Sequence, residues 1–323
     1  MLVGDELVTV AIPVYNGSKY LEQAVISIVQ QSIPVKNCII IDDASTDNID
    51  DVVKNIKEKY NSIRITYYRN EKNIGYPSNW NLCFKYCSTK FLVILHQDDF
   101  LLQDTIEKQL KFFNENPHIA LVGGLEDFIN ERGNIIKTNI KKENKIYQEG
   151  QIYEFVSQTG SYIPCSSVMF DMYKINKVGY FDEDVIATDE LFWPKVLQHY
   201  PIAILGETLI YRRIHPEQTE YGDFIRYEKE AIKIYKKFHR IINYEQRPEF
   251  KKKIQDFLTL KFSQSYIGIA INVAKMGKPW LAIKYIGKSV KIKPNIIFYF
   301  PKMWKSFVKI GLFLVGIKLT NLK

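Results

Sequence analysis

The sequence has few cysteines, and no two of them form a C-x-x-C pair. There are four: Cys38, Cys83, Cys87 and Cys165. Cys83 and Cys87 lie one turn apart in an expected helix, and cysteine is among the residue types that are most often buried. We therefore expect neither a thiolate metal site nor a disulfide framework, and reduced thiols fit a cytoplasmic protein.

Several longer patterns are missing as well. No charged n-region with a following apolar h-region precedes the first expected strand, so we expect no secretory signal peptide. The apolar segment 296–319 contains four lysines, which disfavours a helix that spans a bilayer. Only Gly17 follows the first strand, where a dinucleotide-dependent oxidoreductase needs G-x-G-x-x-G. The glycine-rich, basic N-terminal loop that a pyrophosphorylase needs is missing too.

The net charge of +8 is distributed unevenly. Aspartates cluster in the first half, whereas the region from about Tyr227 to Lys323 is rich in lysine and poor in acidic residues. Such a region suits an anionic surface, and it equally suits a solvated helix face. In segment 296–319 the lysines stand beside aromatic residues such as Trp304 and Phe307. This pattern fits a helix in a membrane interface as well as a helix that packs on the protein through its apolar face.

Short apolar strands alternate with helices over the first 123 residues. The expected strands are 7–14, 37–41, 63–68, 91–95 and 119–122. This alternation predicts an α/β fold, in which a mostly parallel sheet is flanked by helices on both faces. Ligands bind such sheets at the carboxyl ends of the strands.

The remainder of the chain changes character twice. Residues 124–220 are less regular, with an expected helix at 188–200 and short strands at 202–205 and 208–213. Beyond them the pattern is helical. We therefore expect one domain over residues 1–220 and a helical, basic C-terminal region over residues 221–323 that can associate with a membrane.

Four polar clusters lie at one edge of the expected sheet. They are Pro13–Asn16, Asp42–Asp47, Asn73–Gly75 and His96–Asp99. Turn and capping chemistry explains any one of them; Asp47, for example, is placed to cap the helix that follows it. Four clusters at one edge favour a ligand site instead.

The pair Asp98 and Asp99 predicts a divalent cation, because two ionised carboxylates in one cleft repel each other unless a cation compensates them. Magnesium takes one or two protein carboxylates and completes its shell with water and substrate phosphates. We therefore expect Mg²⁺ or Mn²⁺, bridged by the diphosphate of a substrate. Asp43 is a candidate acceptor for a nucleobase ring N–H, and Tyr15 is a candidate stacking surface for the base.

Six short motifs occur along the chain in a fixed order. They are PVYN (Pro13–Asn16), DDASTD (Asp42–Asp47), NIG (Asn73–Gly75), HQDD (His96–Asp99), TDELFW (Thr188–Trp193) and RIH (Arg213–His215). Together they resemble the motifs of the family 2 inverting glycosyltransferases, over about residues 7–219. The resemblance implies a GT-A fold with a nucleotide-binding half at about 1–123 and an acceptor-binding half at about 124–220.

The resemblance also implies roles for individual residues. The residues that it assigns to the nucleotide sugar are Pro13, Tyr15, Asp43, Asn73 and Asp98. It implies that Asp99 binds a divalent metal together with Asp98 and His215, and that Asp189 is the catalytic base.

Two positions depart from the family pattern. His96 stands where many relatives have aspartate, and Thr188 stands where glutamate usually precedes the base. Structural roles also stay open: Asp189 can be a helix cap, and His215 can be a turn residue before proline. The segment Cys165–Ser167, an expected strand, can contact the donor or pack in the core.

We expect an inverting glycosyltransferase that moves a sugar from a nucleotide sugar, UDP-linked in the commonest case of the family, to an acceptor hydroxyl. One base and a metal-assisted leaving group on opposite faces of the sugar give a single displacement. The expected partners are the donor, a glycan or lipid-linked acceptor and a membrane surface, but no nucleic acid. We expect the enzyme in the cytoplasm at the inner face of the cell membrane, in surface-polysaccharide or glycolipid assembly. The competing interpretation is a catalytically inactive nucleotide-sugar-binding or scaffold protein.

Overall fold

The computed structural model describes residues 7–215 and 278–294 without interruption, together with single positions between 233 and 273. The chain divides into two compact units, Met1–Thr219 and Glu220–Lys323. Unit 1 carries the sheet and every motif of the sequence.

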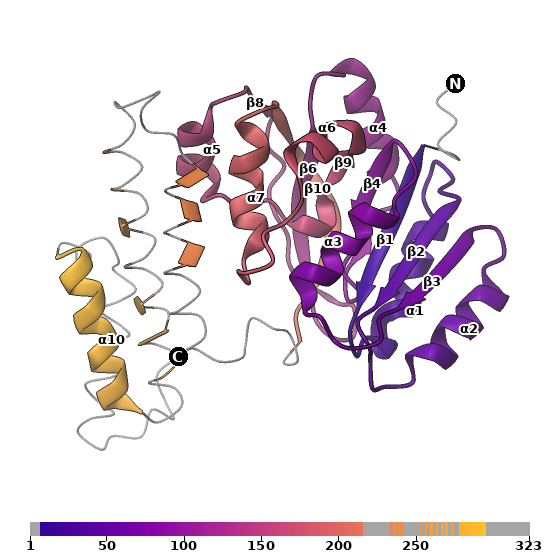
Figure 1. The fold of residues 1–323 in the computed structure, drawn as a ribbon, viewed down its shortest axis with the longest axis horizontal. Coiled ribbons are helices and arrows are strands. Elements are labelled where there is room, and N and C mark those ends of the chain that lie inside the picture. Colours follow the sequence, from indigo (N-terminus) through magenta and orange to yellow (C-terminus); the bar gives the residue numbers. More distant parts are fainter. Residues whose placement is uncertain are drawn as a thin grey trace. The chain divides into compact units, whose positions relative to one another are not determined.

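The first half of unit 1 is a parallel sheet in the order β3-β2-β1-β4. Its strands are β1 (Val8–Val14), β2 (Asn37–Asp42), β3 (Arg64–Arg69) and β4 (Phe91–Ile94). The helices between them are α1 (Ser18–Val29), α2 (Ile49–Lys59) and α3 (Tyr76–Tyr86). Val14 pairs with Asp42, and Asp42 pairs with Arg69, so the first three strands end together at one edge (Figure 1).

In the second half of unit 1 the sheet becomes mixed. It continues from β4 in the order β9-β6-β10-β5, with β9 antiparallel to both neighbours and β10 parallel to β6. The strands are β5 (Phe100–Leu101), β6 (Leu121–Ile129), β7 (Ile135–Lys137), β8 (Lys145–Tyr147), β9 (Met169–Asp171) and β10 (Ile202–Arg213). The helices are α4 (Thr105–Glu115), α5 (Ile152–Thr159), α6 (Met172–Val178) and α7 (Thr188–Leu197). The sheet of ten strands flanked by helices confirms the predicted α/β fold.

Two local predictions for the second half were wrong. Residues 202–213 form one long strand instead of two, with an irregular register against β6 between Ile204 and Thr208. Gly206 lies in this stretch, and a Cβ there would stand 2.0 Å from the carbonyl oxygen of Lys142, so the backbones cross too closely for a side chain. The segment Cys165–Ser167 is a 3₁₀ helix and not a strand.

Strand β1 forms the centre of the core, and every residue in it is buried. Pro13 lies inside this strand although proline cannot donate a ladder hydrogen bond. The pairing with β4 ends at Ala11, whose carbonyl accepts from the amide of Leu95, so Pro13 lies beyond the end of that ladder. Proline is therefore accommodated in a central strand without the loss of a bond to β4.

Helix α7 is buried along most of its length, which makes it a rigid support. Phe192 and Trp193 are almost fully buried and pack in an aromatic cluster with Phe181. Pro194 stands inside the helix and has no N–H to offer the carbonyl of Glu190, four residues earlier. The hydroxyl of Ser161 donates to that carbonyl at 2.6 Å and replaces the missing partner.

Unit 2 has a small helical core of its own. Helix α10 (Pro279–Ile292) packs through Ala282 and Tyr285 against described positions that include Tyr266 and Ala270. The aromatic and lysine-rich segment 296–319, for which we considered a membrane-interface helix, lies outside the described residues. Within the described part of the chain, no helix is both long and apolar enough to cross a bilayer.

Candidate functional site

The loops after β1 and β2 are hydrogen-bonded to each other at the carboxyl edge of the sheet. The amide of Asn16 donates to the hydroxyl of Ser45 at 2.8 Å, and the amide of Thr46 donates to Oδ1 of Asn16 at 2.7 Å. Asn16 and Ala44 both have positive φ angles, of 51° and 59°. For alanine this region is uncommon, and such strain persists where surrounding contacts impose it. The two loops thus form one interlocked unit.

Asp43 holds the loop that precedes α3. It is 2% exposed, and its carboxylate accepts from the amides of Ile74 (2.8 Å) and Gly75 (2.9 Å) and from the side-chain amide of Asn70 (2.9 Å). Gly75 has φ of 86°, where glycine is favoured. Oδ2 accepts one of these bonds, and a carboxylate oxygen can accept two, so capacity remains for a ligand N–H. Asn73 in this loop is exposed, and its side chain accepts from the amide of Gly75.

Tyr15 presents an aromatic side chain on a fixed backbone. The side-chain amide of Gln97 accepts from the amide of Tyr15 at 2.8 Å and donates to its carbonyl at 3.1 Å. Gly17 leaves room for this amide, since a Cβ there would lie 2.2 Å from Oε1 of Gln97. The side chain of Tyr15 is 46% exposed, in contrast to Pro13, which is buried in β1. The bridge by Gln97 is a positioning contact that the sequence did not predict.

Two aspartates of the second motif have structural partners. Asp42 is fully buried and forms an ion pair with Arg69 at 2.8 Å. Asp47 was expected to cap α2, which was wrong: its Oδ2 accepts from the amide of Ser18, the first residue of α1, at 2.9 Å. Asp104 is the N-cap residue of α4, but its carboxylate makes no capping hydrogen bond and forms an ion pair with Lys108 at 2.8 Å.

Asp98 and Asp99 lie at the end of β4 in contrasting environments. Asp98 is 3.0 Å from Nε2 of His215. Burial opposes the ionisation of Asp98, but the hydrogen bond with His215 and smaller contributions from neighbouring groups together outweigh it, and the pKa of Asp98 is lowered. Asp99 is 4% exposed and accepts from the hydroxyl of Ser166 at 2.7 Å and the amide of Arg213 at 3.2 Å. Burial, together with the charge of Asp98, raises the pKa of Asp99 well above its usual range.

Arg213 holds the Asp98–Asp99 loop from behind. It is 1% exposed, and its guanidinium donates to backbone carbonyls, of Asp98 at 3.1 Å and of Glu131 at 2.9 Å among others. It also donates to the side chain of Gln23 on α1. One buried arginine therefore links the end of β10 to α1 and to the loops after β4 and β6. The RIH motif contains this residue, but nothing in the sequence indicates its partners.

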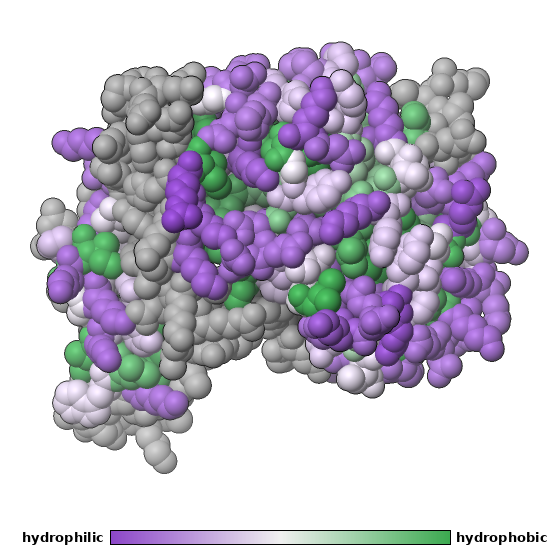
Figure 2. Space-filling view, in the orientation of Figure 1, coloured by the Kyte–Doolittle hydropathy of each residue, from purple (hydrophilic) through white to green (hydrophobic). Residues whose placement is uncertain are grey.

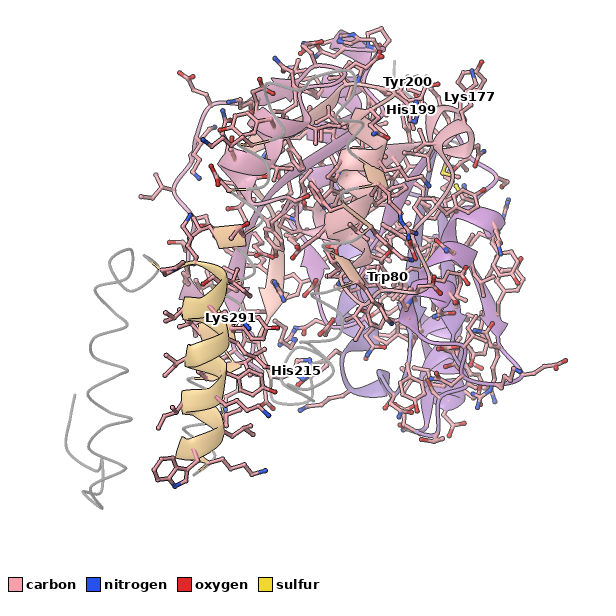
Figure 3. The ribbon with its side chains drawn as sticks, turned by 60° about the vertical axis from the view of Figure 1, so that its left-hand side comes forward. Trp80, Lys177, His199, Tyr200, His215 and Lys291 are labelled. Atoms are coloured by element: carbon pink, nitrogen blue, oxygen red, sulfur yellow. The ribbon has the colours of Figure 1, made fainter. Side chains whose placement is uncertain are left out.

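His96, the departure from the family pattern, is a neutral side chain. Its ring stacks on Trp80 of α3 at a centroid distance of 4.5 Å, and its Nδ1 is 3.7 Å from the carboxylate of Asp99. Burial lowers the pKa of His96 to about 4, so the imidazole carries no charge at neutral pH. Figure 3 labels Trp80 and also His215, which follows β10. With this ring in place of a carboxylate, Asp98 and Asp99 are the two carboxyl groups at the end of β4.

A second polar cluster lies in the other half of unit 1. The hydroxyl of Tyr162 donates to Glu126 at 2.8 Å and accepts from Arg212 at 2.9 Å. Burial and the charge of Glu126 raise the pKa of Tyr162, and the charge of Asp189 contributes in the same direction. The charge of Arg212 in turn acts on Asp99, where it favours the ionised form. The cluster therefore connects the Asp98–Asp99 loop electrostatically with Asp189.

Asp189 stands in the first turn of α7. The N-cap of this helix is Ala187, so the alternative role of Asp189 as the helix cap is wrong. The partial positive charge of a helix N-terminus favours a carboxylate at this place. The buried aromatic face of α7 and the bond from Ser161 to Glu190 restrain the turn that carries Asp189.

Ser166 and Ser167 belong to the framework of the site. Ser166 is buried; its hydroxyl donates to Asp99 and accepts from the amide of His96 at 3.1 Å. The hydroxyl of Ser167 bonds to the backbone of Gly124. We considered two roles for the segment Cys165–Ser167, contact with the donor and packing in the core. Its described contacts are all within the protein and agree with packing in the core.

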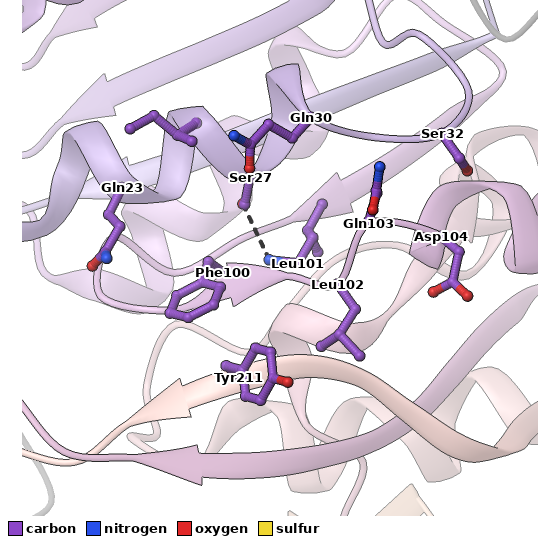
Figure 4. Close-up of a pocket in the computed structure, with 11 residues that line it drawn as sticks. Gln23, Ser27, Gln30, Ser32, Phe100, Leu101, Leu102, Gln103, Asp104 and Tyr211 are labelled. Carbon is purple, nitrogen blue, oxygen red and sulfur yellow. Dashed lines mark hydrogen bonds between the residues drawn. The ribbon is translucent and has the colours of Figure 1, made fainter. Parts of the chain in front are cut away.

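An open cavity of about 640 Å³ lies between α1 and the edge strand β5 (Figure 4). Gln23, Ser27, Phe100 and Tyr211 are among its lining residues. None of the predicted site residues lines it. Ligands of such sheets bind at the carboxyl ends of the strands, so we place the candidate functional site at the carboxyl edge and not in this cavity.

A divalent cation fits the residues at the carboxyl edge. Asp98 and Asp99 supply two hard oxygen ligands, and the raised pKa of Asp99 reflects a buried charge without sufficient compensation, which a cation would provide. Among the described residues no group of three or more His, Cys, Asp or Glu side chains forms a ready metal cage. Two carboxylates suffice for magnesium when substrate phosphates complete the shell.

This sheet order, with two carboxylates after its fourth strand and a third on a buried helix of the second half, is the architecture of a GT-A glycosyltransferase. The mannosyltransferase PcManGT from Pyrobaculum calidifontis, solved with GDP-Man and Mn²⁺, matches 95% of this chain and 86% of its own, with a TM-score of 0.61 and 17% identity. S. aureus TarS, solved with UDP-GlcNAc, matches 90% of each chain with a TM-score of 0.57 and 18% identity. At these identities the likeness shows the fold.

The chain belongs to glycosyl transferase family 2, whose model matches residues 9–175. An uncharacterized glycosyltransferase of Methanocaldococcus jannaschii is 28% identical over 226 residues, which are 69% of this chain and 76% of that protein. Another, from Haemophilus influenzae, is 24% identical over 90% of this chain and 84% of its own length. The chondroitin synthase of Escherichia coli is 28% identical over 214 residues, which are 66% of this chain and 30% of the synthase. The protein is therefore a glycosyltransferase, as the motifs predicted.

Proposed function

We propose that this glycosyltransferase moves a sugar from a nucleotide-sugar donor to an acceptor hydroxyl, with inversion at the anomeric carbon. The observation that carries the proposal is the pair Asp98 and Asp99 at the end of β4. The charge of Arg212 acts on Asp99, Arg212 donates to the hydroxyl of Tyr162, and the charge of Asp189 acts on Tyr162. A UDP-sugar is the proposed donor. TarS is solved with UDP-GlcNAc and PcManGT with GDP-Man, so a GDP-sugar is the first alternative to test.

The nucleotide-binding half, at about 1–123, recognises the donor. In this proposal Tyr15 stacks on the base, and Asp43 accepts from a ring N–H while it holds the Asn73 loop in place. Asp98 binds the ribose or shares the metal. Pro13 is buried, so its proposed part is to shape the backbone before Tyr15.

The leaving group is a nucleoside diphosphate, whose growing negative charge must be stabilised. A bound Mg²⁺ or Mn²⁺ supplies that positive charge. Asp99 and Asp98 would hold the metal, with His215 beside it. The hydrogen bond from His215 fixes the orientation of the Asp98 carboxylate, as partners of metal ligands commonly do.

Asp189 is the proposed base of the acceptor-binding half, at about 124–220. It accepts the proton of the acceptor hydroxyl while the new bond to the anomeric carbon forms and the bond to the diphosphate oxygen breaks. The acceptor attacks from the face opposite to the leaving group, so one displacement inverts the configuration. No carboxylate has to form a covalent intermediate.

The acceptor that we propose is a glycan or a lipid-linked sugar, which places the enzyme in surface-polysaccharide or glycolipid assembly. A chondroitin synthase among the relatives favours a glycan. The proposed place is the cytoplasm, at the inner face of the cell membrane. No nucleic acid takes part.

The test is a panel of UDP-, GDP- and dTDP-sugars, with binding and slow hydrolysis measured in Mg²⁺ or Mn²⁺. We expect one donor to bind only with metal, Asp99→Ala to lose this binding, and Asp189→Ala to keep it without turnover. If no donor binds in the presence of metal, the inactive scaffold interpretation replaces this proposal. Binding without hydrolysis or transfer to any acceptor would identify an inactive nucleotide-sugar-binding protein.

A smaller effect is expected at the base-stacking position. Base–aromatic stacking contributes about 1–3 kcal/mol, so Tyr15→Ser should weaken donor affinity by about 5- to 150-fold and leave kcat at saturating donor unchanged. Calorimetric titration of donor and metal measures the affinity. Tyr68→Ser is the matched control. Tyr68 is exposed to a similar extent, 39%, but its ring already stacks on Tyr86 and is given no part in donor binding. Equal losses in both variants would contradict the stacking role.

A further inference from the structure

Helix α10 of unit 2 exposes a narrow face of unusual composition. Its exposed residues follow helical spacing; they are Trp280, Ile283, Lys284, Gly287 and Lys291. At 3.6 residues per turn these positions span an arc of about 100°. We call this surface the Trp280–Lys291 face. Lys291 is labelled on the helix in Figure 3.

The opposite side of α10 is committed to the core of unit 2. Ala282, Tyr285 and Ser289 are buried. The hydroxyl of Ser289 donates to the carbonyl of Ser263 at 2.8 Å, and the hydroxyl of Ser263 donates to the carbonyl of Ser289 at 2.9 Å. This reciprocal pair fixes the rotation of the helix about its axis, so the Trp280–Lys291 face is held outward.

The face combines apolar and cationic groups without any acidic one. Trp280 is 77% exposed and Ile283 is 39% exposed, which is high for side chains of this size. Residues 278–294 contain five lysines and neither aspartate nor glutamate. Hydrophilic and hydrophobic residues lie side by side over α10 in the space-filling view (Figure 2). Tryptophan next to lysine is the composition of helices that lie in a membrane interface.

We propose that the Trp280–Lys291 face of α10 docks on an anionic lipid bilayer. Trp280 and Ile283 would enter the interface between headgroups and acyl chains, while Lys284 and Lys291 contact acidic headgroups. Charge complementarity decides against a second copy of the chain, because two such faces would bring lysines against lysines. A nucleic acid would satisfy the lysines but leaves Ile283 without a partner.

The inference goes beyond sugar transfer and does not rest on it, because the face belongs to unit 2 and needs no substrate. If the acceptor is lipid-linked, docking would raise its concentration at the enzyme. Membrane binding through such a face is peripheral and reversible. It agrees with the composition of α10 and needs no spanning helix.

The test is flotation of the full-length chain with vesicles of phosphatidylcholine alone or with phosphatidylglycerol added. We expect binding to the anionic vesicles that falls with salt. Each lysine near such a surface contributes about a fivefold factor in partitioning, so Lys284→Gln/Lys291→Gln should lower it about 30-fold. Trp280→Ser/Ile283→Ser should lower it by at least about tenfold.

The matched control is Tyr173→Ser/Lys177→Gln on α6 of unit 1, where the lysine ammonium lies 4.0 Å from the centre of an aromatic ring that is 69% exposed. This variant, and Asp189→Asn, should float as the wild type does. Circular dichroism checks that each α10 variant is folded. Flotation that is unchanged in both α10 variants would overturn the proposal. So would equal binding to neutral vesicles, or binding to a DNA duplex in the absence of vesicle binding.

Discussion

Asp189→Asn is expected to lower kcat for sugar transfer by about 10³-fold, within the 10²–10⁴-fold range of a positioned general base. Asparagine keeps the size and position of the side chain but cannot take the proton of the acceptor hydroxyl. Donor affinity should be unchanged, because the proposed donor contacts lie in the other half of unit 1. Steady-state kinetics with saturating donor, combined with calorimetric titration of donor and metal, measure both quantities.

The control for this variant is Glu190→Gln in the same helical turn. Both substitutions remove one negative charge from the N-terminus of α7, which costs about 0.3–1 kcal/mol of helix stabilisation in either case. Only Asp189→Asn should lose kcat by orders of magnitude. If both variants lose kcat equally, Asp189 acts through the charge of the helix terminus and not as the base. If Asp189→Asn still hydrolyses the donor slowly with water, then the carboxylate is needed to take the proton of the acceptor hydroxyl but not for departure of the leaving group.

The fold and the location of the site could be predicted because both depend on short-range patterns. Short continuous apolar runs such as 7–14 and 91–95, bounded by turn signals, favour strands buried on both faces, and parallel strands place their following loops at one edge. The positions of Asp43, Asp98 and Asp99 at the carboxyl edge follow from that rule alone. The family resemblance added Asp189, which no strand-end rule could supply, since it begins a helix of the less regular half.

The contacts that hold the site could not be predicted in the same way, because they join residues far apart in the chain. Gln97 bridges the backbone of Tyr15 from 82 positions away, and the guanidinium of Arg213 reaches the carbonyl of Asp98 from 115 positions away. The error at Asp47 has the same origin: a local cap was expected, but the tertiary fold brought the amide of Ser18 closer. A charged residue at the end of an apolar strand, as Arg213 is, was the one available signal of a buried polar network.

Asp99→Asn is expected to abolish metal-dependent donor binding and to lower transfer by at least about 10³-fold, while the metal-free protein becomes more stable at neutral pH. The stability change follows from the raised pKa of Asp99. A carboxyl whose folded-state pKa lies above its unfolded value destabilises the fold when ionised. This cost is absent below the unfolded pKa of about 3.9, grows as the pH rises toward the folded pKa, and is complete above it. Asparagine has no such cost. Its Oδ1 can accept from the amide of Arg213, and its Nδ2 can donate to the hydroxyl of Ser166, which reverses the direction of that bond.

Thermal unfolding of both proteins between pH 4 and pH 8 separates a ligand-binding carboxylate from a structural one. The variant should unfold at a higher temperature than the wild type at pH 8, and the difference should disappear toward pH 4. Donor with Mn²⁺ should raise the unfolding temperature of the wild type alone, because binding to the folded state stabilises it. Asp171→Asn is the control: Asp171 is equally buried, at 5% exposure, but forms an ion pair with Lys174 at 2.5 Å, so its loss should destabilise the protein. If Asp99→Asn lowers the unfolding temperature as Asp171→Asn does, then Asp99 stabilises the fold. In that case its carboxylate is not an uncompensated charge that awaits a metal ion, and the proposed metal site is contradicted.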